Sequence, residues 1–212
     1  MAKTHNVVVL SMSTRNPRVG PKIAEFVRQT LSKDATDSSI DLSLVDVNKF
    51  NLPLYDEALA PMQVPAQGQF AHEHSIAWSA EIAKHDAYIL VIPEYNHGVS
   101  GGTKNAVDYL CNEWIGKPAA IVSYGNQGGI RASSQLNETL GGMRLRVAAT
   151  RPALTFARDT PPDVYGAVSQ GILGEASRKT WAAEKTSELL QAFQEVKELL
   201  KESPEGSTVA KV

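Results

Sequence analysis

The sequence has a single cysteine, Cys111, in 212 residues. One thiol cannot form a disulfide within the chain, and it cannot build a multi-cysteine metal or cluster site. No apolar run is long enough to cross a membrane, and the first residues lack the pattern of a signal peptide. We therefore expect a cytoplasmic protein with no metal site and no membrane contact. The neighbours of Cys111 predict a buried helical position and an inert thiol.

Excess charge of either sign is also missing. The formal net charge is -2, and charged residues make up 21% of the chain. This balance argues against nucleic acid as a partner and against the strongly acidic surface of many electron carriers. Two common nucleotide fingerprints are absent as well: no Gly-x-Gly-x-x-Gly occurs, and Gly20-Pro-Lys-Ile lacks the upstream glycine and the Ser or Thr of a P-loop.

Short apolar runs alternate with helical patterns along the chain. The runs predict strands at Val7–Leu10, Ile40–Val47, Tyr88–Ile92, Lys117–Gly125 and, more weakly, within Val147–Phe156. The helical spacing predicts helices at Pro21–Leu31, Glu73–Lys84, Thr103–Trp114, Ile130–Leu145 and Glu175–Lys201. This alternation indicates a doubly wound α/β fold with five parallel strands in the order 2-1-3-4-5 and helices on both faces.

The remaining segments have no clear period. We expect long irregular segments at 51–72 and 158–171, because both are rich in proline or polar residues. No linker or repeat divides the chain, so residues 1–202 are interpreted as one domain. Residues 203–212 are polar and are expected to form a disordered tail.

Three predicted strands end in loops with ligand-binding chemistry, at Ser11–Gly20, Pro93–Gly98 and Ser123–Gly129. Because strands one, three and four are neighbours in the predicted sheet, these loops meet at its carboxyl edge. The first loop supplies hydroxyls, two arginines and a helix N-terminus, which are groups that bind a terminal phosphate. The other two supply amides, glycines and tyrosines, which suit the edge of a flat heterocycle. A solvated basic turn and a tight turn without ligand are the simpler alternatives.

Two details of the second loop bear on chemistry. Pro93 lacks a backbone donor and is expected to end the third strand. His97 has an unperturbed pKa near neutrality and Glu94 carries a carboxylate, so both are candidate acid–base groups. Hydrogen bonding within the loop is the favoured role for His97, and bracing of the loop is the favoured role for Glu94.

The motifs in these loops resemble the NADPH-dependent FMN reductase family, which includes flavodoxin-like quinone, azo-dye and chromate reductases. Pro93-Glu-Tyr-Asn-His-Gly98 with Gly102-Thr-Lys-Asn-Ala-Val-Asp-Tyr-Leu110 carries the resemblance most strongly. Ser13-Thr-Arg15 with Arg18-Val-Gly-Pro-Lys-Ile-Ala24 is similar to the family's phosphate loop. Met12 and Asn126 stand where the family usually or often has glycine.

The resemblance implies a tightly bound FMN with NAD(P)H as reductant. It implies phosphate contacts from Ser13, Arg15, Arg18, Val19 and Gly20. It implies contacts to the isoalloxazine ring and ribityl chain from Pro93, Glu94, Tyr95, Asn96, His97 and Gly98, and from Ser123, Tyr124, Gly125 and Asn126. The flavin then carries the redox chemistry, so no catalytic side chain is expected, and Tyr95 and Asn96 act as positioners.

The implied reaction is hydride transfer from NAD(P)H to the flavin, followed by transfer of two electrons to a quinone, azo dye, flavin or metal oxyanion in a ping-pong cycle. The family also implies a homodimer or tetramer, and Leu52–His72 is the candidate segment for contact with the partner subunit. Two other functions stay open. One is a redox-dependent binding or regulatory protein whose reductase activity is incidental, and the other is a flavodoxin-type electron carrier.

Overall fold

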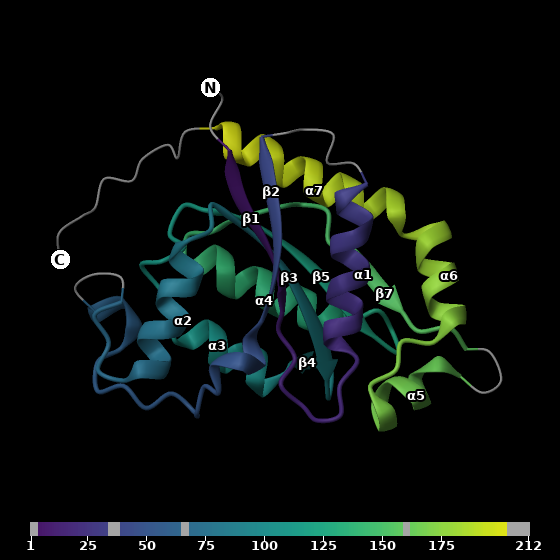
Figure 1. The fold of residues 1–212 in the computed structure, drawn as a ribbon, viewed down its shortest axis with the longest axis horizontal. Coiled ribbons are helices and arrows are strands. Elements are labelled where there is room, and N and C mark those ends of the chain that lie inside the picture. The colour runs from purple at the N-terminus through teal and green to yellow at the C-terminus, as the bar shows by residue number, and fades with distance from the viewer. Residues whose placement is uncertain (1–3, 34–38, 65–67, 159–161, 203–212) are drawn as a thin grey trace.

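A central sheet with helices on both faces forms the protein (Figure 1). The computed structural model describes residues 4–33, 39–64, 68–158 and 162–202. Four long strands pair in parallel in the order β2-β1-β3-β5, with β6 and β7 both beside β5. The bounds are β1 His5–Ser11, β2 Ile40–Asp46, β3 Ala87–Tyr95, β5 Pro118–Gly125, β6 Arg146–Val147 and β7 Ala153–Thr155. This confirms the doubly wound α/β fold and the predicted order of the parallel strands.

The predicted fifth strand is in fact two short strands. β6 pairs with the start of β5 and β7 pairs with its end, while the chain between them leaves the ladder. Pro152 lies directly before β7, and its carbonyl accepts a hydrogen bond from the Ser123 backbone at 3.0 Å. A residue without an N–H group is tolerated here because this is the edge of the sheet.

Side chains of β1 alternate between two cores. Val7 and Val9 pack under α1 Gly20–Ser32 and α7 Thr186–Lys201, whereas Val8 and Leu10 pack on the opposite face. The second face is covered by α2 Glu73–Ala83, α3 Gly101–Asp108 and α4 Ile130–Gly142. Both faces of the central strands are therefore buried, which explains their continuous apolar sequences.

Helix α3 is shorter than predicted and begins earlier. Ser100 caps it by accepting a hydrogen bond from the Thr103 backbone, and the helix ends at Asp108 rather than Trp114. After it, the buried Glu113 carboxylate accepts a hydrogen bond from the Cys111 backbone at 3.0 Å, which fixes a turn. The predicted position of Cys111 is therefore wrong: it lies in this turn and is half-buried. Burial and the nearby Glu113 raise the pKa of its thiol.

Two other predicted helices differ from the structure. Helix α4 ends at Gly142 because Arg144 adopts a left-handed conformation, and the Leu145 backbone bonds back to Leu140. The last predicted helix is broken at Lys185 into α6 Glu175–Glu184 and α7. The break lets Trp181 pack on Phe26 and Phe156 while α7 packs on α1 and β5.

The two segments that were expected to be irregular differ from each other. In the first segment, the described residues 51–64 and 68–72 contain only the short 3-10 helix Pro61–Gln63, in line with the prediction; another 3-10 helix, Val47–Phe50, lies just before it. The second segment instead contains a helix, α5 Asp163–Gln170. The predicted tail at 203–212 lies outside the described residues. None of the described helices is long and apolar enough to cross a membrane.

Candidate functional site

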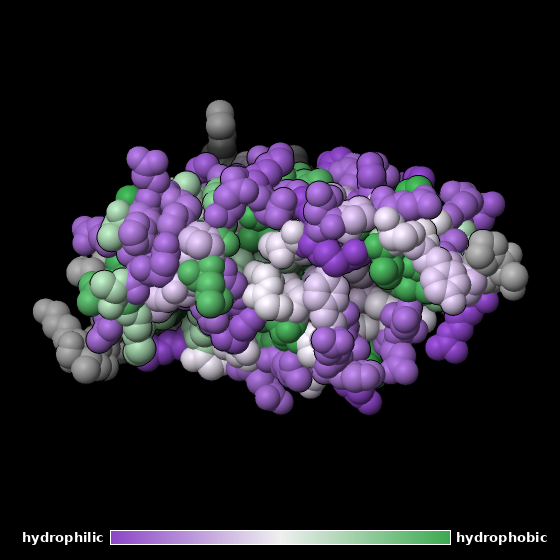
Figure 2. Space-filling model, turned by 90° about the horizontal axis from the view of Figure 1, so that it is seen from below, coloured by the Kyte–Doolittle hydropathy of each residue, from purple (hydrophilic) through white to green (hydrophobic). Residues whose placement is uncertain are grey.

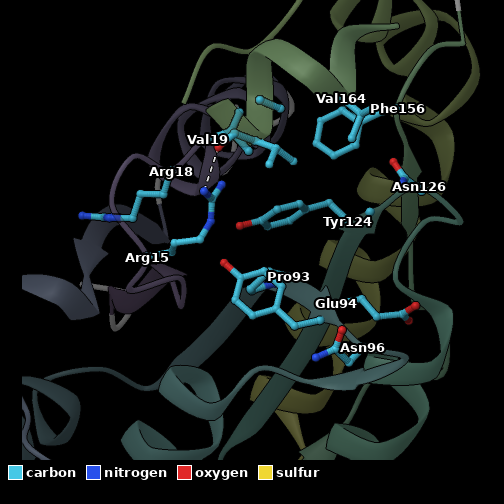
Figure 3. Close-up of a pocket in the computed structure, with 14 residues that line it drawn as sticks. Arg15, Arg18, Val19, Pro93, Glu94, Asn96, Tyr124, Asn126, Phe156 and Val164 are labelled. Atoms are coloured by element: carbon cyan, nitrogen blue, oxygen red, sulfur yellow. Dashed lines mark hydrogen bonds between the residues drawn. The ribbon is translucent and has the colours of Figure 1, made fainter. Parts of the chain in front are cut away.

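A cavity lies at the carboxyl edge of the sheet, where the three predicted loops meet. Figure 2 views the molecule from the side of this edge, and Figure 3 shows the cavity in close-up. Its volume is about 440 Å³, within the range of small-molecule sites. Most of the residues predicted to bind the cofactor line it: Arg15, Arg18, Val19, Pro93, Glu94, Tyr95, Asn96, Tyr124, Gly125 and Asn126. Ser13, Gly20, His97, Gly98 and Ser123 were also predicted and are not among the lining residues.

The first loop leads into the N-terminus of α1 and fits a phosphate group. The helix has no side-chain cap and no acidic residue in its first turn. Pro21 has no N–H group and the Lys22 N–H bonds the Val19 carbonyl, so this terminus offers an anion the Gly20 N–H and the positive end of the helix dipole. The Ser13 hydroxyl is buried without a hydrogen-bond partner, which is unusual for a polar group. The lack of a side chain at Gly20 lets the Ser13 and Tyr124 hydroxyls lie close to the backbone, because a Cβ atom there would collide with both. These features support a phosphate site.

Both arginines of this loop already have partners within the chain. Arg18 forms a two-pronged ion pair with Asp46, with separations of 3.0 Å (Nη1–Oδ1) and 2.7 Å (Nη2–Oδ2). Arg15 donates from Nη1 to the Val168 carbonyl of α5 at 2.7 Å, the bond drawn as a dashed line in Figure 3. Each guanidinium has five N–H donors, so each keeps donors for a ligand. Both side chains line the cavity, but the pair with Asp46 holds the end of Arg18 toward β2 and away from Tyr124 (Figure 3), whereas the bond to Val168 holds Arg15 against α5.

The second loop is a β-hairpin. The parallel ladder ends at Pro93 as expected, but the expectation that the strand ends there is wrong. β3 continues through Pro93 to Tyr95 and pairs with β4 Gly98–Val99 in antiparallel fashion. Pro93 is tolerated because it comes where pairing with β5 ends. Asn96 and His97 both have positive φ values, 48° and 65°, as the two central residues of a type I′ turn do.

Three hydrogen bonds, accepted by two side chains, attach this hairpin to α4. Glu94 Oε2 accepts hydrogen bonds from the Arg131 and Ala132 backbones at 2.9 and 3.2 Å, at the uncapped start of the helix. Gln135 accepts one from the Val99 backbone at 3.0 Å. The bracing role expected for Glu94 agrees with these bonds. His97 lies at the tip of the turn, away from the cavity lining.

The third loop places two adjacent side chains in different surroundings. Ser123 is fully buried and donates to the Gly128 carbonyl at 2.7 Å, so it closes the loop rather than facing the cavity. Tyr124 lines the cavity, and its hydroxyl lies beside the phosphate loop near Gly20. Burial raises the pKa of the Tyr124 phenol, which keeps this hydroxyl protonated at neutral pH.

The sequence prediction missed an apolar wall of the cavity. Phe156 and three residues of α5 form it: Val164, Ala167 and Val168. In Figure 3, Phe156 and Val164 lie on one side of Tyr124, and Pro93 and Asn96 lie on the other. The spacing of the three α5 residues is helical, and Pro162 and Gly171 flank the helix. That pattern was the signal that could have revealed this wall.

The chain matches a known protein family. The model of the family "NADPH-dependent FMN reductase" matches residues 5–159, which is most of the chain and includes all three loops. The chain belongs to the NADPH-dependent FMN reductase family.

Full-length relatives agree with this family. An NAD(P)H-dependent FMN reductase of Nectria sp is 50% identical over 201 residues, covering 94% of this chain and 98% of its own. A second NAD(P)H-dependent FMN reductase, from Schizosaccharomyces pombe, is 35% identical over 202 residues, covering 95% of this chain and 94% of its own. A quinone reductase of Pseudomonas putida is 28% identical over 200 residues, covering 91% of this chain and 92% of its own.

Solved structures agree with the fold of the family. FerB, a flavoenzyme NAD(P)H:acceptor oxidoreductase from Paracoccus denitrificans, aligns with a TM-score of 0.61 at 21% identity, covering 93% of this chain and 96% of its own. An oxidoreductase from Corynebacterium diphtheriae aligns with a TM-score of 0.64 at 16% identity, covering 95% of this chain and 100% of its own. At these identities the likeness concerns the fold alone.

Proposed function

We propose that this protein is an FMN-dependent NAD(P)H oxidoreductase that reduces quinones and similar acceptors, including azo dyes, flavins and metal oxyanions. The observation that carries the proposal is the single cavity formed by the phosphate loop, the Glu94–Val99 hairpin and the loop after β5. Membership of the NADPH-dependent FMN reductase family supports the cofactor and the reductant. The name of the Pseudomonas putida relative supports quinones as acceptors.

The cavity lining suggests how the cofactor is oriented. We assign the phosphate to Ser13, Arg15, Arg18 and the N-terminus of α1, where the Ser13 hydroxyl is buried without a partner and the Gly20 N–H is not used within the helix. The ring and ribityl chain are assigned to the other lining residues of the two remaining loops: Pro93, Glu94, Tyr95, Asn96, Tyr124, Gly125 and Asn126. His97, Gly98 and Ser123 then act indirectly, by holding the turn and the loop in shape.

When bound, FMN supplies the redox chemistry by accepting a hydride from NAD(P)H and returning two electrons to the acceptor. The chain's own task is to position the reactants and to exclude water. Glu94 is engaged with the α4 backbone and His97 does not line the cavity, so neither is assigned a proton-transfer role. Tyr95 and Asn96 line the cavity at the end of the hairpin and are assigned to orient the ring.

A homodimer is part of the proposal. The segment after β2 exposes several large apolar side chains, with Leu54 84%, Met62 76% and Leu59 50% exposed. The same segment is firmly attached, because Asp56 accepts hydrogen bonds from both His74 and Tyr109 at 2.9 Å. A fixed segment with exposed apolar residues suits contact with a second subunit. The single cysteine suits a reducing compartment, and we place the protein in the cytoplasm.

An absorption spectrum of the purified protein, reconstituted with FMN and freed of excess cofactor, tests the proposal. We expect flavin absorbance that bleaches when NADPH or NADH is added without oxygen and returns when a quinone is added. Riboflavin is the matched ligand, since it has the same ring and no phosphate, and we expect it to be retained much more weakly. A protein that keeps no FMN under these conditions would contradict the proposal.

A further inference from the structure

Helix α5 closes one side of the cavity and is attached to the molecule at both ends. At its start, the Asp163 carboxylate accepts a hydrogen bond from the Ser177 backbone of α6 at 2.6 Å. At its end, Gly171 has a φ of 67°, and a Cβ atom there would lie 2.7 Å from the Arg18 carbonyl oxygen. The C-terminal end of α5 therefore rests directly on the backbone of the phosphate loop.

A hydrogen bond from Arg15 joins the same two segments. Its guanidinium donates to the carbonyl of Val168 at 2.7 Å. Val168 is in the last turn of α5, where carbonyl groups have no partner within the helix. A cation at this end also interacts favourably with the helix dipole. Arg15 thus stabilises α5 from outside the helix.

The guanidinium is able to hold a phosphate and this carbonyl together. It has five N–H donors in a fixed plane, and two of them on one edge match two oxygens of a phosphate. A phosphate bound in this way leaves an Nη1 hydrogen for Val168 and fixes the plane of the group. The side chain then loses less conformational freedom when it binds the carbonyl, so the two contacts strengthen each other.

We propose that Arg15 is a positioning residue that couples occupancy of the phosphate loop to the docking of α5. The phosphate of the cofactor stabilises α5 against the loop, and α5 then completes the apolar wall of the cavity. This inference rests on the proposed function, because it assigns the phosphate of FMN to the loop.

The coupling has a consequence for acceptor binding. Val164, Ala167 and Val168 present only apolar side chains to the cavity, and the carbonyl of Val168 is already engaged with Arg15. The hydrophobic effect has no preferred direction and depends on the apolar area that is buried. Such a wall therefore distinguishes planar acceptors by their size and apolar character. The bound cofactor stabilises this wall further, so we expect the acceptor to bind more tightly to the FMN-loaded protein than to the protein without FMN.

Hydrogen–deuterium exchange of a peptide that spans α5 tests the coupling. In the native sequence, we expect saturating FMN to slow exchange in α5 about tenfold, the size expected for one charge-assisted hydrogen bond. Inorganic phosphate at high concentration is expected to slow it as well, without any flavin ring. Arg15→Lys keeps the charge but lacks the planar fork. In R15K, the logarithm of the factor by which FMN slows exchange in α5 should be less than half of its value in the native protein.

Arg18→Lys is the matched variant, because Arg18 belongs to the same loop but pairs with Asp46 instead of α5. FMN-loaded R18K should slow exchange in α5 as the native protein does. In steady-state assays with a bulky quinone, FMN-loaded R15K is compared with the FMN-loaded native protein. The factor by which KM rises should be several times the factor by which kcat falls.

Two results would overturn the proposal. One is equal slowing of α5 exchange in loaded R15K and in the native protein. The other is no slowing by FMN at all, in a protein whose absorbance shows that FMN is bound. The second result leaves the proposed function standing, since retention of the flavin is measured separately by its absorbance.

Discussion

Arg18 and Asp46 join the start of α1 to the end of β2 through two parallel hydrogen bonds of 3.0 and 2.7 Å. Their side chains are only 16% and 17% exposed, so the pair is shielded from solvent. Asp46 also accepts a hydrogen bond from the Asn48 backbone at 3.2 Å. The pair therefore fixes the phosphate loop to the neighbouring strand of the sheet before any ligand binds.

Replacing Asp46 by alanine should destabilise the cofactor-free protein by about 2 kcal/mol, because a largely buried guanidinium loses its partner. Saturating FMN should recover more stability in D46A than in the native protein, since a phosphate near Arg18 replaces the missing charge. Urea unfolding with and without FMN measures both effects. Asp108→Ala is the control: its ion pair with Lys104 is exposed, and its loss should cost at most about 0.5 kcal/mol.

Replacing Gly20 by alanine should weaken FMN binding at least about tenfold and destabilise the protein by about 1–3 kcal/mol. The reason is steric, because the added methyl group meets the Ser13 and Tyr124 hydroxyls in a tightly packed loop. Flavin titration followed by absorbance measures the affinity. Gly141→Ala in α4 is the matched control, since a Cβ atom there meets nothing within 4 Å. It should leave FMN affinity unchanged and raise stability by about 0.5–1 kcal/mol.

His85 should make the protein less stable as the pH falls from 7.5 to 5.5. Burial lowers the pKa of this histidine below its ordinary value of 6.5 and outweighs the opposing contact with Glu81. The unfolded chain therefore takes up the proton at a higher pH than the folded chain, so stability is lost below about pH 6.5. His85→Gln should flatten this part of the curve of unfolding free energy against pH. Identical slopes for the two proteins would contradict this account.

Replacing Leu54 and Met62 together by aspartate should shift the proposed dimer toward monomer. Both side chains are among the most exposed apolar residues, and a buried charge at an interface is costly. Light scattering coupled to gel filtration measures the mass. Ile172→Asp, at an exposed apolar position after α5, is the control and should leave the mass unchanged. A monomeric native protein, or a dimer that survives both changes, would remove this segment from the interface.

The parallel strands and the three loops at their carboxyl ends could be predicted from the sequence alone. Continuous apolar runs such as Val7–Leu10 occur where a strand is buried on both faces, and helical spacing occurs where one face of a helix is buried. Both patterns are local, so they can be read without knowledge of partners in space. The family motifs are local as well, because they lie within single strand–loop–helix units.

Contacts between residues far apart in the chain could be found only in the three-dimensional structure. Pro93 stays in β3 because Gly98 and Val99 fold back to pair with the strand, and Glu94 serves α4 rather than the cavity. Arg15 meets Val168 across 153 positions of the chain, and this contact holds the wall that the sequence prediction missed. Hydrogen bonds and ion pairs of this kind depend on distances in space, and no period along the chain encodes them.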